Sequence, residues 1–102
     1  MSGFGFLDID RKKYVTAMAQ NLPTLRAKLG LSQTQLAECI GVTRQTISSI
    51  ENQSRELSWP NFLSLLFLFS QNEQTMKLLP VMEIYTPELE QVFSFADLGR
   101  LK

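Results

Sequence analysis

The fold of this chain is constrained most by one stretch, LSQTQLAECIGVTRQTISSIEN. Ser32, followed by Gln35 three residues later, matches a capping box at the start of a helix. Gly41 can adopt the left-handed conformation that ends this helix, and Thr43 can cap the next one. The sequence therefore predicts two short helices within residues 32–52, joined by a tight turn at Gly41.

Further helices are predicted on both sides of this unit, and no segment alternates with period two for long enough to suggest a strand. Apolar residues of segment 11–29 repeat at threes and fours, which favours either two helical pieces, with Asn21 as a cap, or one helix kinked at Pro23. Capping and breaking signals predict three more helices, over about residues 58–71, over 72–85 with a kink at Pro80, and over 86–95. We therefore expect an all-α fold of about five helices with a C-terminal helical extension.

Composition limits the function. The 102 residues suit one domain with a real core, and the formal net charge is zero. Residues 1–58 hold seven basic and five acidic side chains, whereas residues 59–102 hold three and five, so a nucleic acid would contact the front half. With one cysteine and no histidine, neither a structural zinc site nor a Cys-His nucleophile is expected, and we expect no enzyme, metal or cofactor.

Membrane association is not expected either. The most apolar run, FLSLLFLF, has eight residues, well short of the roughly 20 that span a bilayer. The N-terminus lacks the basic, apolar and small-residue sequence of a secretory signal. A cytoplasmic protein is the expectation.

The second predicted helix has a polar side that folding alone does not explain. Ile47 and Ile50 give it a narrow apolar stripe, and the opposite side carries Arg44, Gln45, Ser48 and Ser49. One interpretation is that the two helices meet only to close a core, and the other is that the polar side binds a partner.

The residues GLSQTQLAECIGVTRQTISSIEN, preceded by LRAKL, resemble the lambda repressor and Cro type of helix-turn-helix domain, also called the Xre family, over roughly residues 21–70. The resemblance implies a lambda-repressor-like fold and sequence-specific binding of double-stranded DNA. Together with the helix signals along the chain, we expect three parts: a flexible arm (1–10), whose residues show no periodicity, a DNA-binding domain (11–71, with its helix-turn-helix unit at about 32–52) and a C-terminal helical extension that contributes to dimerisation (72–102).

In the family, the second helix of the unit enters the major groove. Carried over to this sequence, base contacts fall on Gln45, Arg44, Ser49 and Ser48. Gln can pair bidentately with adenine and Arg with guanine, although Arg44 can instead grip a phosphate.

The resemblance assigns phosphate contacts to Gln33, Thr43, Ser54 and Arg55. Gln33 alternatively serves capping only, and Arg55 is alternatively a solvated loop charge. The resemblance also implies a structural salt bridge between Arg26 and Glu51.

One residue departs from the family, which usually has Gly at the position of Gln53. Because Gln adopts a positive φ poorly, we expect either that Asn52 takes the left-handed conformation or that the helix runs on by a turn.

The tail raises the question of partners. Phe67 and Leu68 lie off the core-facing side of their helix, and the last two predicted helices are rich in apolar residues. Packing within one chain is one explanation and a homodimer interface through Phe67 and Leu68 is the other; we expect a mixture. The predicted function is a dimeric repressor on a near-palindromic operator with half-site centres about 10 base pairs apart. The alternative is an antitoxin-like or other interaction module whose C-terminal helices bind a second protein.

Overall fold

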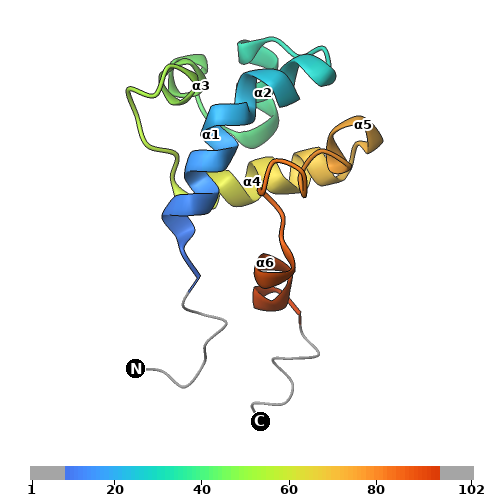
Figure 1. The fold of residues 1–102 in the computed structure, drawn as a ribbon. Coiled ribbons are helices and arrows are strands. Elements are labelled where there is room, and N and C mark those ends of the chain that lie inside the picture. Colours follow the sequence, from blue (N-terminus) through green and yellow to red (C-terminus); the bar gives the residue numbers. More distant parts are fainter. Residues whose placement is uncertain (1–8, 95–102) are drawn as a thin grey trace.

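The structure, a computed structural model, describes residues 9–94 and consists of helices joined by turns and loops (Figure 1). Every regular element in this range is helical, which confirms the all-α prediction. The helices are α1 (Arg11–Lys28), α2 (Gln33–Ile40), α3 (Arg44–Glu51), α4 (Trp59–Ser70), α5 (Glu73–Met76) and α6 (Pro87–Val92).

Four of these helices begin where the sequence places a capping side chain. Each cap accepts a hydrogen bond from the backbone N–H three residues later, and the caps are Ser32, Thr43, Ser58 and Thr86. At the start of α2 the bond is reciprocal, since the Gln35 side chain also accepts from the Ser32 N–H at 2.9 Å. Gly41 ends α2 with a φ of +79°. The boundaries of the helix-turn-helix unit are therefore set locally.

Helix α1 lies at the centre of the fold and packs against α3, α4 and α5. Its fully buried side chains include Tyr14, Met18, Leu22 and Leu25. They share one core with residues of α2, α3, α4 and α6 and with Leu57, Leu79 and Ile84 of the connecting segments. Figure 1 shows α2 and α3 at the C-terminal end of α1 and α6 at its N-terminal end. The helix-turn-helix unit is thus mounted on one end of α1.

The prediction for the first helix is settled in favour of a single element. Helix α1 runs through Pro23 without a break, and Asn21 is not a cap, because its amide donates to the Ala17 carbonyl at 2.8 Å within the helix.

The prediction of a long fifth helix over residues 72–85, in contrast, is wrong, because the helix is much shorter. Helix α5 has four residues, and turns follow it up to Glu83, which has a φ of +59°. Pro80 lacks a backbone donor and disfavours a helical conformation at the residue before it, so the apolar spacing of this segment does not extend the helix. Asn72 also differs from the expectation. It precedes α5, but its side chain makes no capping hydrogen bond to that helix, and its amide donates instead to the Leu68 carbonyl at the end of α4.

The tail packs in part on its own chain. Leu79, Ile84 and Leu89 are almost fully buried, and the buried Tyr14 hydroxyl donates to the Glu88 carboxylate at 3.1 Å. Other apolar side chains of the chain remain exposed, namely Phe67 (69 %), Met76 (48 %), Val81 (79 %) and Phe93 (47 %).

At the other end, the predicted arm is partly structured where the structure describes it. Ile9 packs against the core and Asp10 caps α1. Residues 1–8 of the predicted arm and residues 95–102 of the predicted extension lie outside the described range, as does Phe95, the predicted end of the sixth helix. Between residues 9 and 94, no helix is long and apolar enough to cross a membrane.

Candidate nucleic-acid interface

Helix α3 is fixed to the domain by two isoleucines. Ile47 and Ile50 are completely buried, and α2 packs directly against α3 with Leu36 and Ala37 inside the same core. Ala37 is small enough to let the two helices cross closely. The apolar stripe predicted from the sequence is thus the face by which α3 is held.

The predicted base-contact residues lie on the remaining sides of α3. Arg44 and Gln45 are exposed, while Ser48 and Ser49 are half-buried. Of the predicted phosphate contacts, Gln33 begins α2 and Thr43 precedes α3, where its hydroxyl already accepts from the Thr46 N–H at 3.2 Å.

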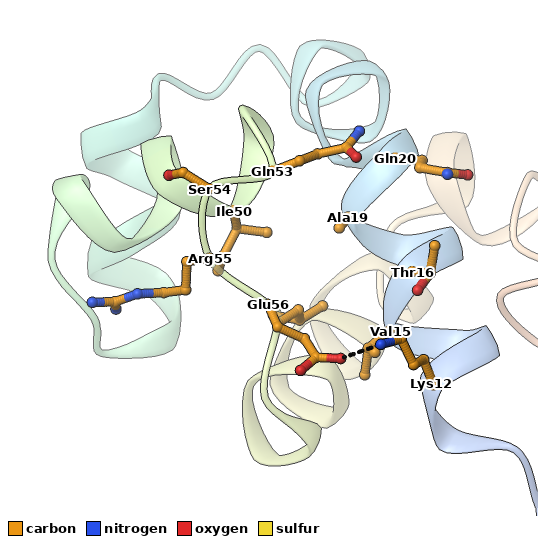
Figure 2. Close-up of a pocket in the computed structure, with 11 residues that line it drawn as sticks. Lys12, Val15, Thr16, Ala19, Gln20, Ile50, Gln53, Ser54, Arg55 and Glu56 are labelled. Carbon is orange, nitrogen blue, oxygen red and sulfur yellow. Dashed lines mark ion pairs between the residues drawn. The ribbon is translucent and has the colours of Figure 1, made fainter.

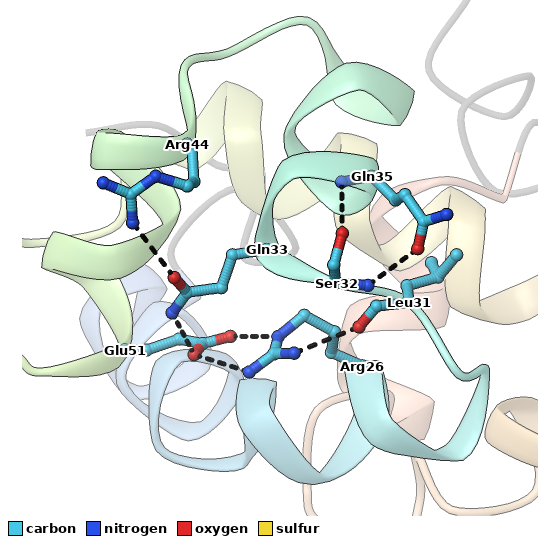
Figure 3. A network of polar contacts seen from close by, with 7 residues as sticks. All are labelled: Arg26, Leu31, Ser32, Gln33, Gln35, Arg44 and Glu51. Carbon is cyan, nitrogen blue, oxygen red and sulfur yellow. Dashed lines mark hydrogen bonds and ion pairs between the residues drawn. The ribbon is translucent and has the colours of Figure 1, made fainter.

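A polar network joins α1, α2 and α3 behind this surface (Figure 3). Arg26 and Glu51 form a two-point ion pair, with Nε to Oε2 at 2.8 Å and Nη2 to Oε1 at 3.0 Å. Arg26 also donates from Nη1 to the Leu31 carbonyl at 3.0 Å. The side chains are 21 % and 8 % exposed, so this pair ties the end of α3 to α1 from a largely buried position.

The pair changes the ionisation of both groups. Burial opposes ionisation of Glu51, but hydrogen bonds from Arg26 and Gln33 and the charge of Arg26 outweigh it, so the pKa of Glu51 lies below its ordinary value. The hydrogen bond to Glu51 raises the pKa of Arg26 against the effect of burial. Both groups are therefore charged at neutral pH.

Gln33 belongs to the same network, which the sequence analysis missed. Its Nε2 donates to Glu51 Oε1 at 2.9 Å, and its Oε1 accepts from Arg44 Nη1 at 3.4 Å. These partners are 18 and 11 residues away, and no local pattern indicates such bonds.

The end of α3 corrects both expectations for Gln53. Gln53 itself is left-handed, with a φ of +65°, whereas Asn52 has a φ of −89° and the helix stops at Glu51. The Gln53 N–H donates to the Ile50 carbonyl at 3.1 Å, and the Ser54 N–H donates to the Ser49 carbonyl at 2.9 Å. This pair of bonds is a Schellman motif, in which a positive φ is required at the position of Gln53. The backbone geometry that glycine usually supplies is therefore kept without glycine.

The loop after α3 is held in place by that motif and by side chains. Arg55 donates from Nη1 to the Thr46 hydroxyl at 3.1 Å, and the Ser54 N–H also donates to the Asn52 side chain at 2.9 Å. Figure 2 shows the Arg55 side chain pointing away from α1, on the side of α3. Ser54 and Arg55, the remaining predicted phosphate contacts, are both exposed.

A pocket of about 370 Å³ lies between this loop and α1 (Figure 2). Val15, Ala19 and Ile50 line it together with the loop, and an exposed ion pair between Lys12 Nζ and Glu56 Oε2 spans its rim at 3.6 Å. Exposed pairs of this kind contribute little to stability, so the loop depends mainly on the backbone bonds described above.

The predicted dimer residues lie away from this loop. Phe67 and Leu68 line an open groove between α2 and α4, together with Cys39, Ile40, Leu63, Ser64 and Gln71. No charged side chain lines the groove within the described residues.

Comparison with known proteins identifies the sequence family of the segment that contains α2 and α3. The family model for the helix-turn-helix domain matches residues 24–64, which run from the second half of α1 into α4 and contain the whole of α2 and α3. Neither the curated proteins nor the solved structures gave a match. The matched residues, the buried stripe of α3 and its outward polar side agree with one another, and residues 24–64 form a DNA-binding helix-turn-helix domain of the lambda repressor or Xre type, the type found in transcription regulators.

Proposed function

We propose that the protein is a sequence-specific repressor that binds a near-palindromic operator as a homodimer and blocks access to the promoter. The observation that carries this proposal is the position of α3, whose two isoleucines are buried while Arg44 and Gln45 face solvent. A helix held in this way can enter the major groove, about 12 Å wide, without rearrangement of the domain. Binding of this kind needs no cofactor.

Within this proposal Gln45 and Arg44 read base edges, with Ser49 and Ser48 beside them. A glutamine amide can pair with adenine N6 and N7 and a guanidinium with guanine O6 and N7. Phosphates would lie against the exposed Ser54 and Arg55 and near the start of α2 and α3, where free backbone N–H groups and the helix dipole favour an anion.

A dimer would supply the affinity for DNA that a single domain lacks. The chain has no net charge, so one copy offers few phosphate contacts, and two copies that read two half-sites together gain specific affinity. Two half-sites of one duplex lie about 34 Å apart, which the two α3 helices of the dimer must match.

The groove beside Phe67 supports this interface. Phe67 is 69 % exposed at the edge of a groove whose lining includes Ile40, Leu63 and Leu68. A two-fold axis would place each Phe67 in the groove of the other copy, and the uncharged lining brings no repulsion between copies. We assign residues 11–71 to DNA binding and residues 72–102 to a supporting part of the interface, to which the exposed Met76 contributes.

The proposal is tested by gel shift on the DNA upstream of the protein's own gene, against a scrambled duplex of equal composition, at rising salt. Preferential binding of the native sequence at moderate salt is expected. Equal binding of both duplexes would contradict sequence-specific regulation.

A second function is favoured by the same exposed apolar side chains. Phe67 and Val81 would also suit a different protein, as in an antitoxin-like module whose DNA binding is secondary. Purification from the native host distinguishes the two, since a stoichiometric second protein supports this function and a pure homodimer supports the repressor.

A further inference from the structure

Arg55, in the loop after α3, is attached to that helix at two points. Its backbone N–H donates to the Ser49 carbonyl at 3.2 Å, and its Nη1 donates to the Thr46 hydroxyl at 3.1 Å. Residues three apart, such as 46 and 49, are neighbours on one side of a helix. The Arg55 side chain therefore runs back along α3 toward its first turn, and Figure 2 shows it pointing away from α1.

The acceptor of this bond is itself held in place. The Thr46 hydroxyl lies 3.0 Å from the Thr43 hydroxyl, and the Thr46 N–H donates to Thr43 Oγ1 at 3.2 Å. A guanidinium only donates hydrogen bonds, so the Thr46 oxygen accepts from Arg55. Thr46 is the one side-chain acceptor of Arg55 within the described residues, which leaves most of the five guanidinium N–H donors for another partner.

The attachment places Arg55 beside the outward face of α3. Successive residues of a helix lie about 100° apart around its axis, so Arg44 and Thr46 lie on opposite sides of Gln45. Arg44 is turned toward α2, where its Nη1 donates to Gln33 Oε1 at 3.4 Å (Figure 3). Arg44 and Arg55 therefore flank the exposed Gln45 from opposite sides of the helix.

We propose that Thr46 is a positioning residue, which holds Arg55 against a DNA phosphate on the wall of the major groove opposite to the one beside α2. Outward residues of a helix in this groove meet base edges, whereas residues at its sides meet the two backbones that form the walls. A guanidinium can bind a phosphate with two parallel hydrogen bonds.

The inference rests on the proposed function, because it names one DNA contact and the residue that places it. It replaces the interpretation of Arg55 as a solvated loop charge. In a chain without net charge, each phosphate contact is a large share of the electrostatic affinity for DNA.

The test measures the affinity of the full chain for its selected operator and for a scrambled duplex between about 50 and 200 mM salt. One phosphate contact contributes about 0.9 to the slope of log affinity against log salt concentration. Arg55→Ala should weaken binding to both duplexes, and its deficit should shrink roughly threefold to fourfold over this range. Lys77→Ala is the matched control, because it removes the same charge from an exposed site after α5 and should leave the slope unchanged.

Variants of Thr46 separate positioning from structure. Thr46→Val keeps the branched shape without the hydroxyl and should weaken binding about twofold to tenfold at an unchanged slope, because Arg55 stays charged but must be ordered on binding. Thr46→Ser keeps the hydroxyl and should bind as the unaltered protein does. In the Arg55→Ala background, Thr46→Val should cause no further loss.

Three results would overturn the inference: an unchanged slope for Arg55→Ala, no loss from Thr46→Val, or an equal loss from Thr46→Val with and without Arg55. Equal affinity of the unaltered protein for the two duplexes would instead contradict the proposed function. The slope comparison on either duplex would then still decide whether Arg55 binds a phosphate.

Discussion

Replacement of Gln53 by glycine should stabilise the protein. Gln53 has a φ of +65°, a conformation that costs an L residue roughly 1–2 kcal/mol relative to glycine. Glycine also has more freedom in the unfolded chain, which offsets about 0.4–1 kcal/mol of the gain. The Gln53 side chain is exposed, so its loss removes little packing. We expect a net gain of about 0.5–1 kcal/mol, which for a domain of this size raises Tm by roughly 3–6 °C.

The assay is thermal and urea unfolding of three variants under the same conditions. Gln53→Ala is the matched control, because alanine keeps the strain of a Cβ at positive φ and should leave Tm nearly unchanged. Gly41→Ala is the reverse case, with a φ of +79° and no atom within 4 Å of the added Cβ, and it should lower stability by about 1 kcal/mol. An equal rise for Gln53→Ala and Gln53→Gly, or no rise for either, would refute the reasoning.

Three further predictions concern the ion pair, the interface and readout. The pKa of Glu51 is lower in the folded protein than in the unfolded chain. The ionised carboxylate therefore stabilises the fold fully above the unfolded pKa of about 4.3, and this stabilisation is lost as the pH falls through the pKa of the folded protein. Glu51→Gln should therefore cost about 2 kcal/mol at pH 7 in urea unfolding, and the difference from the unaltered protein should shrink toward pH 3; a constant difference would contradict it. Phe67→Glu should yield monomers by light scattering and weaken operator binding, while Asn61→Glu adds the same charge to α4 outside the groove and should leave the mass unchanged. An unchanged mass for Phe67→Glu counts against the interface. Gln45→Ala should lose about 1–3 kcal/mol of discrimination at one half-site position in competition binding, and a uniform loss at all positions would disagree with base readout.

The parts of the fold that depend on neighbouring residues were predictable from sequence. Ser32, Thr43, Ser58 and Thr86 each cap the helix that follows them, because a cap needs only the backbone three residues on. The outward side of α3 was predictable for a similar reason, since Ile47 and Ile50 fix which side is buried.

The remaining features depend on contacts that sequence spacing does not reveal. Apolar spacing suggested a long fifth helix, but the chain turns before Pro80 to bury Leu79 and Ile84 in the core around α1. Gln53 keeps a left-handed conformation because two backbone bonds at the end of α3 require it, despite the side chain. The link from Gln33 to Glu51 joins residues 18 apart and exists only once α2 and α3 have packed.

The central claim is that α3 gives the protein a sequence preference on two related half-sites. Selection of bound sequences from a random pool of double-stranded DNA tests it most directly, because one measurement gives the site, its symmetry and its spacing. The account predicts a near-palindromic motif with half-site centres about 10 base pairs apart, or a multiple of that. A pool that remains random after repeated selection by folded protein would contradict it.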